Sequence, residues 1–238
     1  AIARARMLYA RRYAPKPDIV AQMQAQTDAE FVHSLRLAVG GGLTRAALVL
    51  LGRPEATYAL GGPTPRISWQ LVDHRGDHVT HQHFELPLVL AIDALVGRVR
   101  IIDVNLLPPR EVAPLNLPNY DDWVLREALH NCVAHQDYAQ GGRILVTESP
   151  DTLRFFNYGE FLPGSVDKVL HAAQPEQRYR NACLANAMVE LDLMETINSG
   201  VKGMFRKQRE RFFPLPDYAI EGPPPSVSVT IYGRTLDE

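Results

Sequence analysis

The stretch RILVTESPDTLRFFN, residues 143–157, limits the possible folds more than any other part of the sequence. Its two halves are rich in the β-branched, apolar and aromatic residues that strands prefer. Between them, Ser-Pro-Asp at 149–151 has the composition of a tight turn. The pattern therefore predicts two neighbouring strands, at residues 143–148 and 152–157.

Further strands and helices surround this pair. Residues 226–233 alternate apolar residues as a closing strand, and residues 66–85 read as a hairpin that turns at His-Arg-Gly-Asp. Helical patterns lie at 120–136, 165–173, 178–191 and 196–212. Helices on a mostly antiparallel sheet predict an α+β fold, here a two-layer α/β sandwich with a mixed sheet.

The first half of the chain predicts a smaller α/β region. Helices are expected at 1–13, 27–39, 43–52 and 86–101, and Thr27 with Glu30 has the spacing of a capping box. The proline-rich stretch 104–118 suggests a boundary near residue 110. It would divide the chain into a connecting region, 1–110, and a second domain, 111–238. Because the chain opens in a helical pattern, the first region is expected to be incomplete at its start.

Composition excludes several classes of protein. Of the 238 residues, 46% are hydrophobic and 22% are charged, which is typical of soluble globular proteins. The net charge of -2 gives no overall attraction to nucleic acid or anionic membranes. No apolar run reaches the roughly 20 residues that span a bilayer, and no signal-peptide pattern appears. Cys132 and Cys183 lie in helical patterns, which is typical of reduced thiols in a cytoplasmic protein.

The predicted helix 120–136, which Asn119 is expected to cap, carries three polar residues at intervals of four: Glu127, Asn131 and His135. Residues four apart on a helix are neighbours, so the three line one stripe. A carboxylate can polarise a water for attack, and an amide oxygen is a ligand suited to Mg²⁺. The stripe therefore predicts either a phosphoryl-transfer site or a solvated polar face without chemistry.

A resemblance bears on this choice. The strings REALHNCVAHQDY and RILVTESPDTLRFFNYGEFLPG resemble the carboxy-terminal ATPase-like domain of the RecG-related transcriptional regulators. That domain is a divergent GHKL, or Bergerat-fold, domain akin to those of histidine kinases and gyrase. The string GGLTRAALVLLGRPE resembles the segment that joins it to the family's amino-terminal AlbA-like module. The resemblance covers most of residues 27–234 and implies a domain that binds ATP with Mg²⁺.

The resemblance also implies roles for single residues. Glu127 would be the catalytic carboxylate, Asn131 would bind Mg²⁺ and nucleotide, and His135 would contact the nucleotide as the next residue of the stripe. Asn157 and Gly159, in NYGEF, match the first glycine box, whose usual acidic residue accepts a proton from the adenine amino group.

The second glycine motif falls at Ser199 and Gly200, in INSGVKGM, where backbone would approach phosphates at a helix start. The sequence departs from the family pattern at several positions. Asn157 carries no charge, Glu160 stands where glycine is common, and Asn198 replaces the first glycine of the second motif. These departures predict nucleotide binding with weak or no ATP hydrolysis.

Three further sequence features give weaker indications of function than the stripe on helix 120–136. Four histidines crowd the hairpin HRGDHVTHQH, but no cysteine or close carboxylate pair accompanies them, so a metal site there is not the favoured interpretation. The run 202–211 is basic, which predicts either a solvated helix face or a contact with phosphate or DNA. No lysine sits in the Gly-x₄-Gly-Lys-Ser/Thr setting of a P-loop, which excludes a P-loop helicase motor.

Two classes of function therefore remain open. The domain is either a nucleotide-binding regulatory unit of a transcriptional regulator, or a degenerate sensor or dimerisation module that has lost ATP. The expected partners are a nucleotide and another copy of the chain. DNA is expected to be contacted only through a segment outside this chain, because the charge is balanced and no helix-turn-helix or zinc-finger spacing appears.

Overall fold

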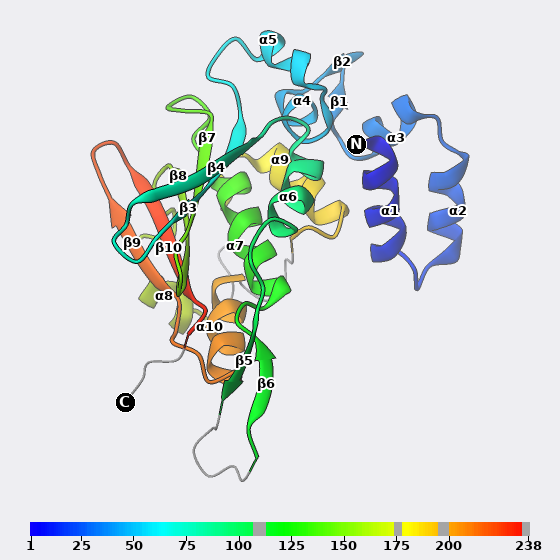
Figure 1. Ribbon diagram of the computed structural model, residues 1–238. Helices are drawn as coiled ribbons and strands as arrows, with labels where there is room; N and C mark the ends of the chain where they lie inside the picture. Colours follow the sequence, from blue (N-terminus) through cyan, green and yellow to red (C-terminus); the bar gives the residue numbers. More distant parts are fainter. Residues whose placement is uncertain (107–112, 174–177, 195–199, 235–238) are drawn as a thin grey trace.

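The computed structural model describes residues 1–106, 113–173, 178–194 and 200–234. A six-stranded sheet forms one layer, with the strand order β4-β3-β7-β8-β10-β9 (Figure 1). Strand β3 runs parallel to β7, and the other neighbouring pairs are antiparallel, so the sheet is mixed as predicted. The strands are β3 Arg66–Val72, β4 His78–Phe84, β7 Arg143–Glu148, β8 Thr152–Tyr158, β9 Asp217–Glu221 and β10 Ser226–Tyr232.

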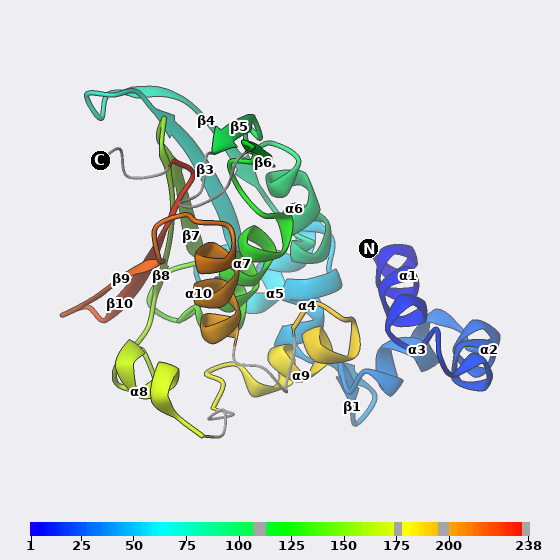
Figure 2. The ribbon, with the colours of Figure 1, turned by 90° about the horizontal axis from the view of Figure 1, so that it is seen from below.

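Three helices form the second layer: α6 (Leu88–Val96), α7 (Asp122–His135) and α10 (Gly200–Glu210). Figure 2 shows them together on one face of the sheet. The core between the layers includes the fully buried side chains of Trp69 and Phe155, and along β8 buried residues alternate with more exposed ones. The fold is the two-layer α/β sandwich that the sequence predicts.

The remaining elements flank this sandwich. Helices α8 (Val166–His171) and α9 (Ala182–Glu190) lie between β8 and α10 in the sequence. The first helices, α1 to α3, lie on the side of the helical layer that faces away from the sheet (Figures 1 and 2). They and their neighbours are α1 Ile2–Arg12, α2 Pro17–Ala25, α3 Asp28–Ser34, β1 Ala38–Val39, β2 Gly42–Leu43, α4 Arg45–Leu51, η1 Pro54–Ala56 and α5 Thr57–Leu60.

The start of α7 corrects one sequence-based expectation. Asp121, not Asn119, caps this helix, because its side chain accepts a hydrogen bond from the backbone N–H of Val124 at 3.1 Å. Asn119 instead accepts from the backbone N–H of Ile102 at 3.0 Å and of Tyr120 at 3.1 Å. It therefore fixes the segment that leads into the helix, while the carboxylate satisfies the first turn.

The structure also differs from the sequence-based expectations near the glycines 40–42 and in the proline-rich stretch. The Thr27–Glu30 capping box is present, but α3 ends at Ser34, and a short β1–β2 hairpin turns at the glycines that were expected to end a longer helix. The proline-rich stretch contains a hairpin of β5 (Asp103–Leu106) and β6 (Leu115–Pro118). Neither hairpin shows the long alternating pattern by which strands are recognised in a sequence.

The sheet continues across residue 110. Strand β3 pairs along its length with β7, from Arg66 with Arg143 to Leu71 with Glu148. The hairpin β3–β4 thus belongs to the same layer as β8 and β10, although it precedes the proline-rich stretch. The division into 1–110 and 111–238 stays a prediction about the chain's organisation, and it does not coincide with an edge of the sheet.

Candidate functional site

Helix α7 separates a buried apolar side from a polar stripe. Val124, Leu125, Leu129 and Val133 are fully buried against the sheet and neighbouring helices. The residues of the predicted stripe, Glu127, Asn131 and His135, lie instead along one wall of a cavity of about 260 Å³. The helix was predicted for its spacing alone, and the structure places the three polar side chains on the same enclosed space.

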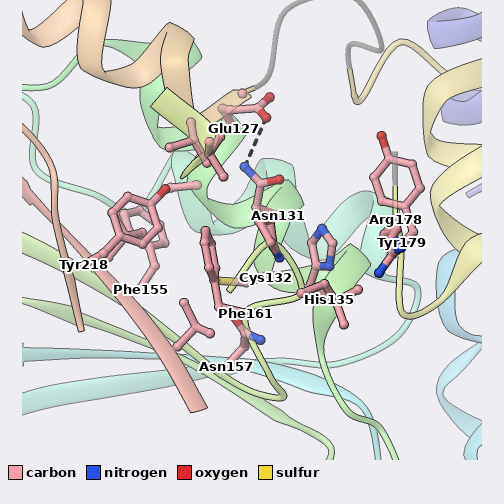
Figure 3. Close-up of a pocket in the computed structure, with 18 of the residues that line it drawn as sticks. Glu127, Asn131, Cys132, His135, Phe155, Asn157, Phe161, Arg178, Tyr179 and Tyr218 are labelled. Carbon is pink, nitrogen blue, oxygen red and sulfur yellow. Dashed lines mark hydrogen bonds between the residues drawn. The ribbon is translucent and has the colours of Figure 1, made fainter. Parts of the chain in front are cut away.

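The other walls come from distant parts of the chain (Figure 3). Strand β8 contributes Phe155 and Asn157, and the edge strand β9 contributes Tyr218. The first two residues of α10, Gly200 and Val201, close the end next to Glu127. The cavity is further lined by Ala128, Cys132, Glu160, Phe161, Leu162, Pro163, Lys168, Val169, Ala172, Arg178, Tyr179, Met194, Val227 and Val229.

Glu127 and Asn131 are joined directly. The Nδ2 atom of Asn131 donates a hydrogen bond to Oε1 of Glu127 at 3.0 Å, drawn as a dashed line in Figure 3. With its amide nitrogen directed at the carboxylate, Asn131 has its amide oxygen available for another partner. Glu127 itself is only 6% exposed, so its carboxylate is held almost out of water.

Gly200 packs against the same carboxylate. A β-carbon at this position would lie 1.6 Å from Oε1 of Glu127 and 2.4 Å from its Cδ. Only a residue without a side chain can therefore start α10 beside Glu127. Glu127 therefore packs directly against the backbone of α10 at Gly200.

Asn157 reaches the cavity from the end of β8. It is 5% exposed, and its Nδ2 donates to the carbonyl oxygen of Tyr158 at 3.0 Å. That bond uses the amide nitrogen, and the amide oxygen of Asn157 makes no hydrogen bond within the described residues.

Gly159 lies at the turn that follows and is not part of the cavity wall. Its φ is +128°, a region that favours glycine. A β-carbon there would lie 2.9 Å from both Nε of Arg180 and the carbonyl oxygen of His135. Gly159 therefore lets the turn pack against the end of α7. Ser199 and Asn198 lie outside the described residues.

His135 is a neutral group in this site. Burial, and secondarily the Arg180 guanidinium, lower the pKa of His135 to about 4. Its ring packs against Tyr179, with the ring centroids 5.6 Å apart. A neutral imidazole can donate or accept a hydrogen bond, but it adds no positive charge for a phosphate.

Several lining residues were not found from the sequence, and Tyr218 is the most informative. Within the described residues its hydroxyl has no hydrogen-bond partner, while its ring packs near Phe161 and Phe205, with centroids 6.0 and 6.3 Å away. Burial, and then the nearby Cys132 and Glu127, raise the pKa of Tyr218 above its usual range. The Gly-Pro-Pro-Pro turn before the closing strand could have indicated the hairpin partner that carries it.

The cavity residues fit an Mg²⁺ ion that binds weakly together with a ligand better than a permanently bound Mg²⁺ ion. The described residues include no group of three or more histidine, cysteine, aspartate or glutamate side chains that could hold a metal. One amide oxygen, from Asn131, with the neighbouring Glu127, matches the few protein ligands that Mg²⁺ takes when phosphates and waters supply the others.

The two secondary signals have structural explanations. His78, His81 and His83 follow the edge strand β4 with rings 5.2 Å apart, and His83 contacts the Ser68 hydroxyl at 2.9 Å. On α10, Lys207 pairs with Asp121 at 3.5 Å, and Arg206 lies 3.9 Å from Glu210. Part of the basic run is thus neutralised by the protein itself.

Comparisons with known proteins bear on the carboxy-terminal part of the chain and on the fold. Residues 141–231 match the family model described as "Putative ATP-dependent DNA helicase recG C-terminal", so the carboxy-terminal part of the chain is ATPase-like. No curated protein matches the sequence. Among the described residues, no helix is both long and apolar enough to cross a membrane.

One solved structure shares the fold over almost the whole chain. The DIP2311 protein from Corynebacterium diphtheriae superposes with a TM-score of 0.74 at 20% sequence identity, covering 97% of this chain. The same match covers 44% of that protein, so this chain spans less than half of its length.

Proposed function

We propose that the cavity beside α7 binds an adenine nucleotide, and that the domain is a regulatory unit of a transcriptional regulator with weak or no Mg²⁺-dependent ATP hydrolysis. One observation carries the proposal. Glu127, Asn131 and His135 of α7, Asn157 of β8 and Gly200 of α10 border one cavity, and the carboxy-terminal part of the chain is ATPase-like.

The enclosed end of the cavity suits a purine base. Its walls are mainly apolar and aromatic, with Phe155, Phe161 and Tyr218 among them. Small-molecule sites typically combine such walls with a few polar groups that fix orientation. The amide oxygen of Asn157 can accept a hydrogen bond from the adenine amino group, whereas guanine presents an acceptor at that position.

The polar end suits a phosphate chain with a cation. Lys168 and Arg178 line the cavity, and the amide oxygen of Asn131 can serve as a Mg²⁺ ligand beside the phosphates. Glu127 is the group that could activate a water. Its contacts with Asn131 and the start of α10 already hold the carboxylate, which supports weak turnover.

A second candidate is a sensor of a ligand other than ATP. The described cavity wall carries two carboxylates, Glu127 and Glu160, against two cations, Lys168 and Arg178. This balance is less favourable to a triphosphate than a net positive wall would be. The proposal also places any DNA contact outside this chain, since Lys207 and Arg206 of the basic run are paired with carboxylates.

Calorimetric titration with ADP, Mg²⁺-ATP and GDP tests the proposal. The Asn157→Leu variant should lose adenine nucleotide binding, and Asn157→Asp, which keeps an acceptor oxygen, should retain it. Asn131→Ala should weaken only the Mg²⁺-dependent part of the affinity. Asn116→Ala, on the exposed β6 strand, is the matched control. Equal binding of ADP by wild type and Asn157→Leu would refute the adenine assignment, and no binding by wild type would favour the non-ATP sensor.

A further inference from the structure

Three neighbouring strands contribute a row of side chains to the floor of the cavity. Tyr218 of β9 is opposite Val229 of β10, and Val229 is opposite Phe155 of β8. Residues directly opposite each other in an antiparallel pair share one face of the sheet, and all three line the cavity (Figure 3). Asn157, two residues after Phe155, points to the same face. Tyr218 and Asn157 therefore face one cavity, with strand β10 between them.

The hydroxyl of Tyr218 is a polar group in the aromatic part of this space. It makes no hydrogen bond within the described residues, and the centroid of its ring lies 6.0 Å from that of Phe161 and 6.3 Å from that of Phe205. Burial, and then Cys132 and Glu127, raise the pKa of Tyr218, so the hydroxyl keeps its proton at neutral pH. An enclosed hydroxyl without a partner costs free energy, which an acceptor atom of a ligand would recover.

Asn157 offers the complementary group on the other side of β10. Its Nδ2 donates to the carbonyl oxygen of Tyr158 at 3.0 Å, and its amide oxygen makes no hydrogen bond within the described residues. Strand spacings of about 4.8 Å and about 3.4 Å per residue put the α-carbons of Tyr218 and Asn157 roughly 12 Å apart. Val227 and Val229, which lie between them on β10, also line the cavity. A flat heterocycle above these valines would meet a donor at one end and an acceptor at the other.

We infer that Tyr218 is a base-recognition residue, whose hydroxyl donates a hydrogen bond to a ring nitrogen of the bound purine while Asn157 accepts one from its amino group. The inference rests on the proposed adenine-nucleotide function and deepens it by naming a second contact with the base. Adenine offers ring nitrogens as acceptors in addition to its amino donor. Two polar contacts from different strands would fix the orientation of a base that the apolar walls only enclose.

The test removes the donor and the acceptor separately. ADP and three deaza analogues, in which C–H replaces ring nitrogen N1, N3 or N7, are titrated into wild type and Tyr218→Phe by calorimetry. In wild type, one analogue should bind about five- to tenfold more weakly than ADP. In Tyr218→Phe, ADP should be weakened by about the same factor, and that analogue should bind no more weakly than ADP. Such coupling between one ligand atom and one side chain identifies a direct contact.

Tyr58→Phe is the matched control, because it removes a hydroxyl from a ring on α5 that is 90% exposed and does not line the cavity. It should keep the wild-type ratios of affinity, and thermal unfolding shows whether both variants are folded. If no deaza analogue binds wild type more weakly than ADP, or if each such loss is equally large in Tyr218→Phe, the inference is overturned while the proposed function stands. If ADP does not bind wild type, the proposed function fails and the inference fails with it.

Discussion

The amide of Asn131 donates to the carboxylate of Glu127 at 3.0 Å, and Gly200 leaves room for that carboxylate at the start of α10. Glu127 thereby contacts α10, which is separated from α7 in the sequence by strands β7 and β8 and helices α8 and α9. This contact has consequences for stability that can be measured without any ligand.

Gly200→Ala should destabilise the fold. Its β-carbon would fall 1.6 Å from Oε1 of Glu127, so the carboxylate or the helix must move. Forced overpacking of this kind costs about 1–3 kcal/mol. Urea unfolding followed by circular dichroism measures the loss. Gly62→Ala, where a β-carbon would meet nothing within 4 Å, should stay within about 0.5 kcal/mol of wild type. Equal stabilities for the two variants would argue against the packing of Glu127 on α10.

Tyr218→Phe should separate binding from stability. The hydroxyl makes no hydrogen bond within the described residues, so removing it should leave the free energy of unfolding unchanged or raised by up to about 1 kcal/mol. Nucleotide affinity should fall by about five- to tenfold if the hydroxyl contacts the ligand. By contrast, Tyr138→Phe removes a hydroxyl that donates to the Val133 carbonyl at 3.0 Å and should cost about 1 kcal/mol of stability. A destabilised Tyr218→Phe protein would mean that the hydroxyl has a structural role.

Stability should decline on mild acidification. Burial, and secondarily Arg126, lower the pKa of His130 to about 3, and the pKa of His135 is lowered to about 4. In the unfolded chain a histidine takes up a proton below about pH 6.5, whereas these two stay neutral in the folded protein. Their contribution is complete above about pH 6.5 and is lost as pH falls towards 4, by about 1.4 kcal/mol per pH unit for each histidine.

Urea unfolding between about pH 7 and about pH 5 measures this slope. His130→Gln should be less stable than wild type at neutral pH but should show a shallower decline, because glutamine does not titrate. His74→Gln, at the exposed turn of the β3–β4 hairpin, should keep the slope of wild type. Parallel slopes for wild type and His130→Gln would contradict the buried neutral state of that ring.

The chain alone should not bind duplex DNA specifically. Phosphate contacts by lysine and arginine need a clustered positive surface, and on α10 Lys207 and Arg206 are already paired with Asp121 and Glu210. A gel-shift titration at about 150 mM salt checks this expectation. A sequence-dependent shift at submicromolar protein, lost on neutralising Arg206, Lys207 and Arg209, would place a DNA-reading surface in this chain.

Local patterns explain what could be predicted from the sequence. Strands β7, β8 and β10 and helix α7 each have a clear period, and the stripe of Glu127, Asn131 and His135 follows from that period alone. The residues of the remaining cavity wall could not be predicted in this way. Tyr218 lies on the edge strand β9 and Lys168 on α8, and both line the cavity through tertiary packing. A pattern of apolar and polar residues within one element cannot predict such packing. The cap at Asp121 was missed because a neighbouring asparagine has the same preference for helix starts.

The parallel pairing of β3 with β7 determines which fragments of this protein can be prepared in isolation. A fragment limited to the family-matched residues 141–231 would lack α7 and would leave the backbone of β7 without its neighbour. Unpaired strand edges promote intermolecular association. Such a fragment should aggregate, and a soluble fragment with the cavity intact must begin before Arg66. During synthesis, the ribosome must likewise release β7 before the hairpin β3–β4 finds its place, so this pairing forms late.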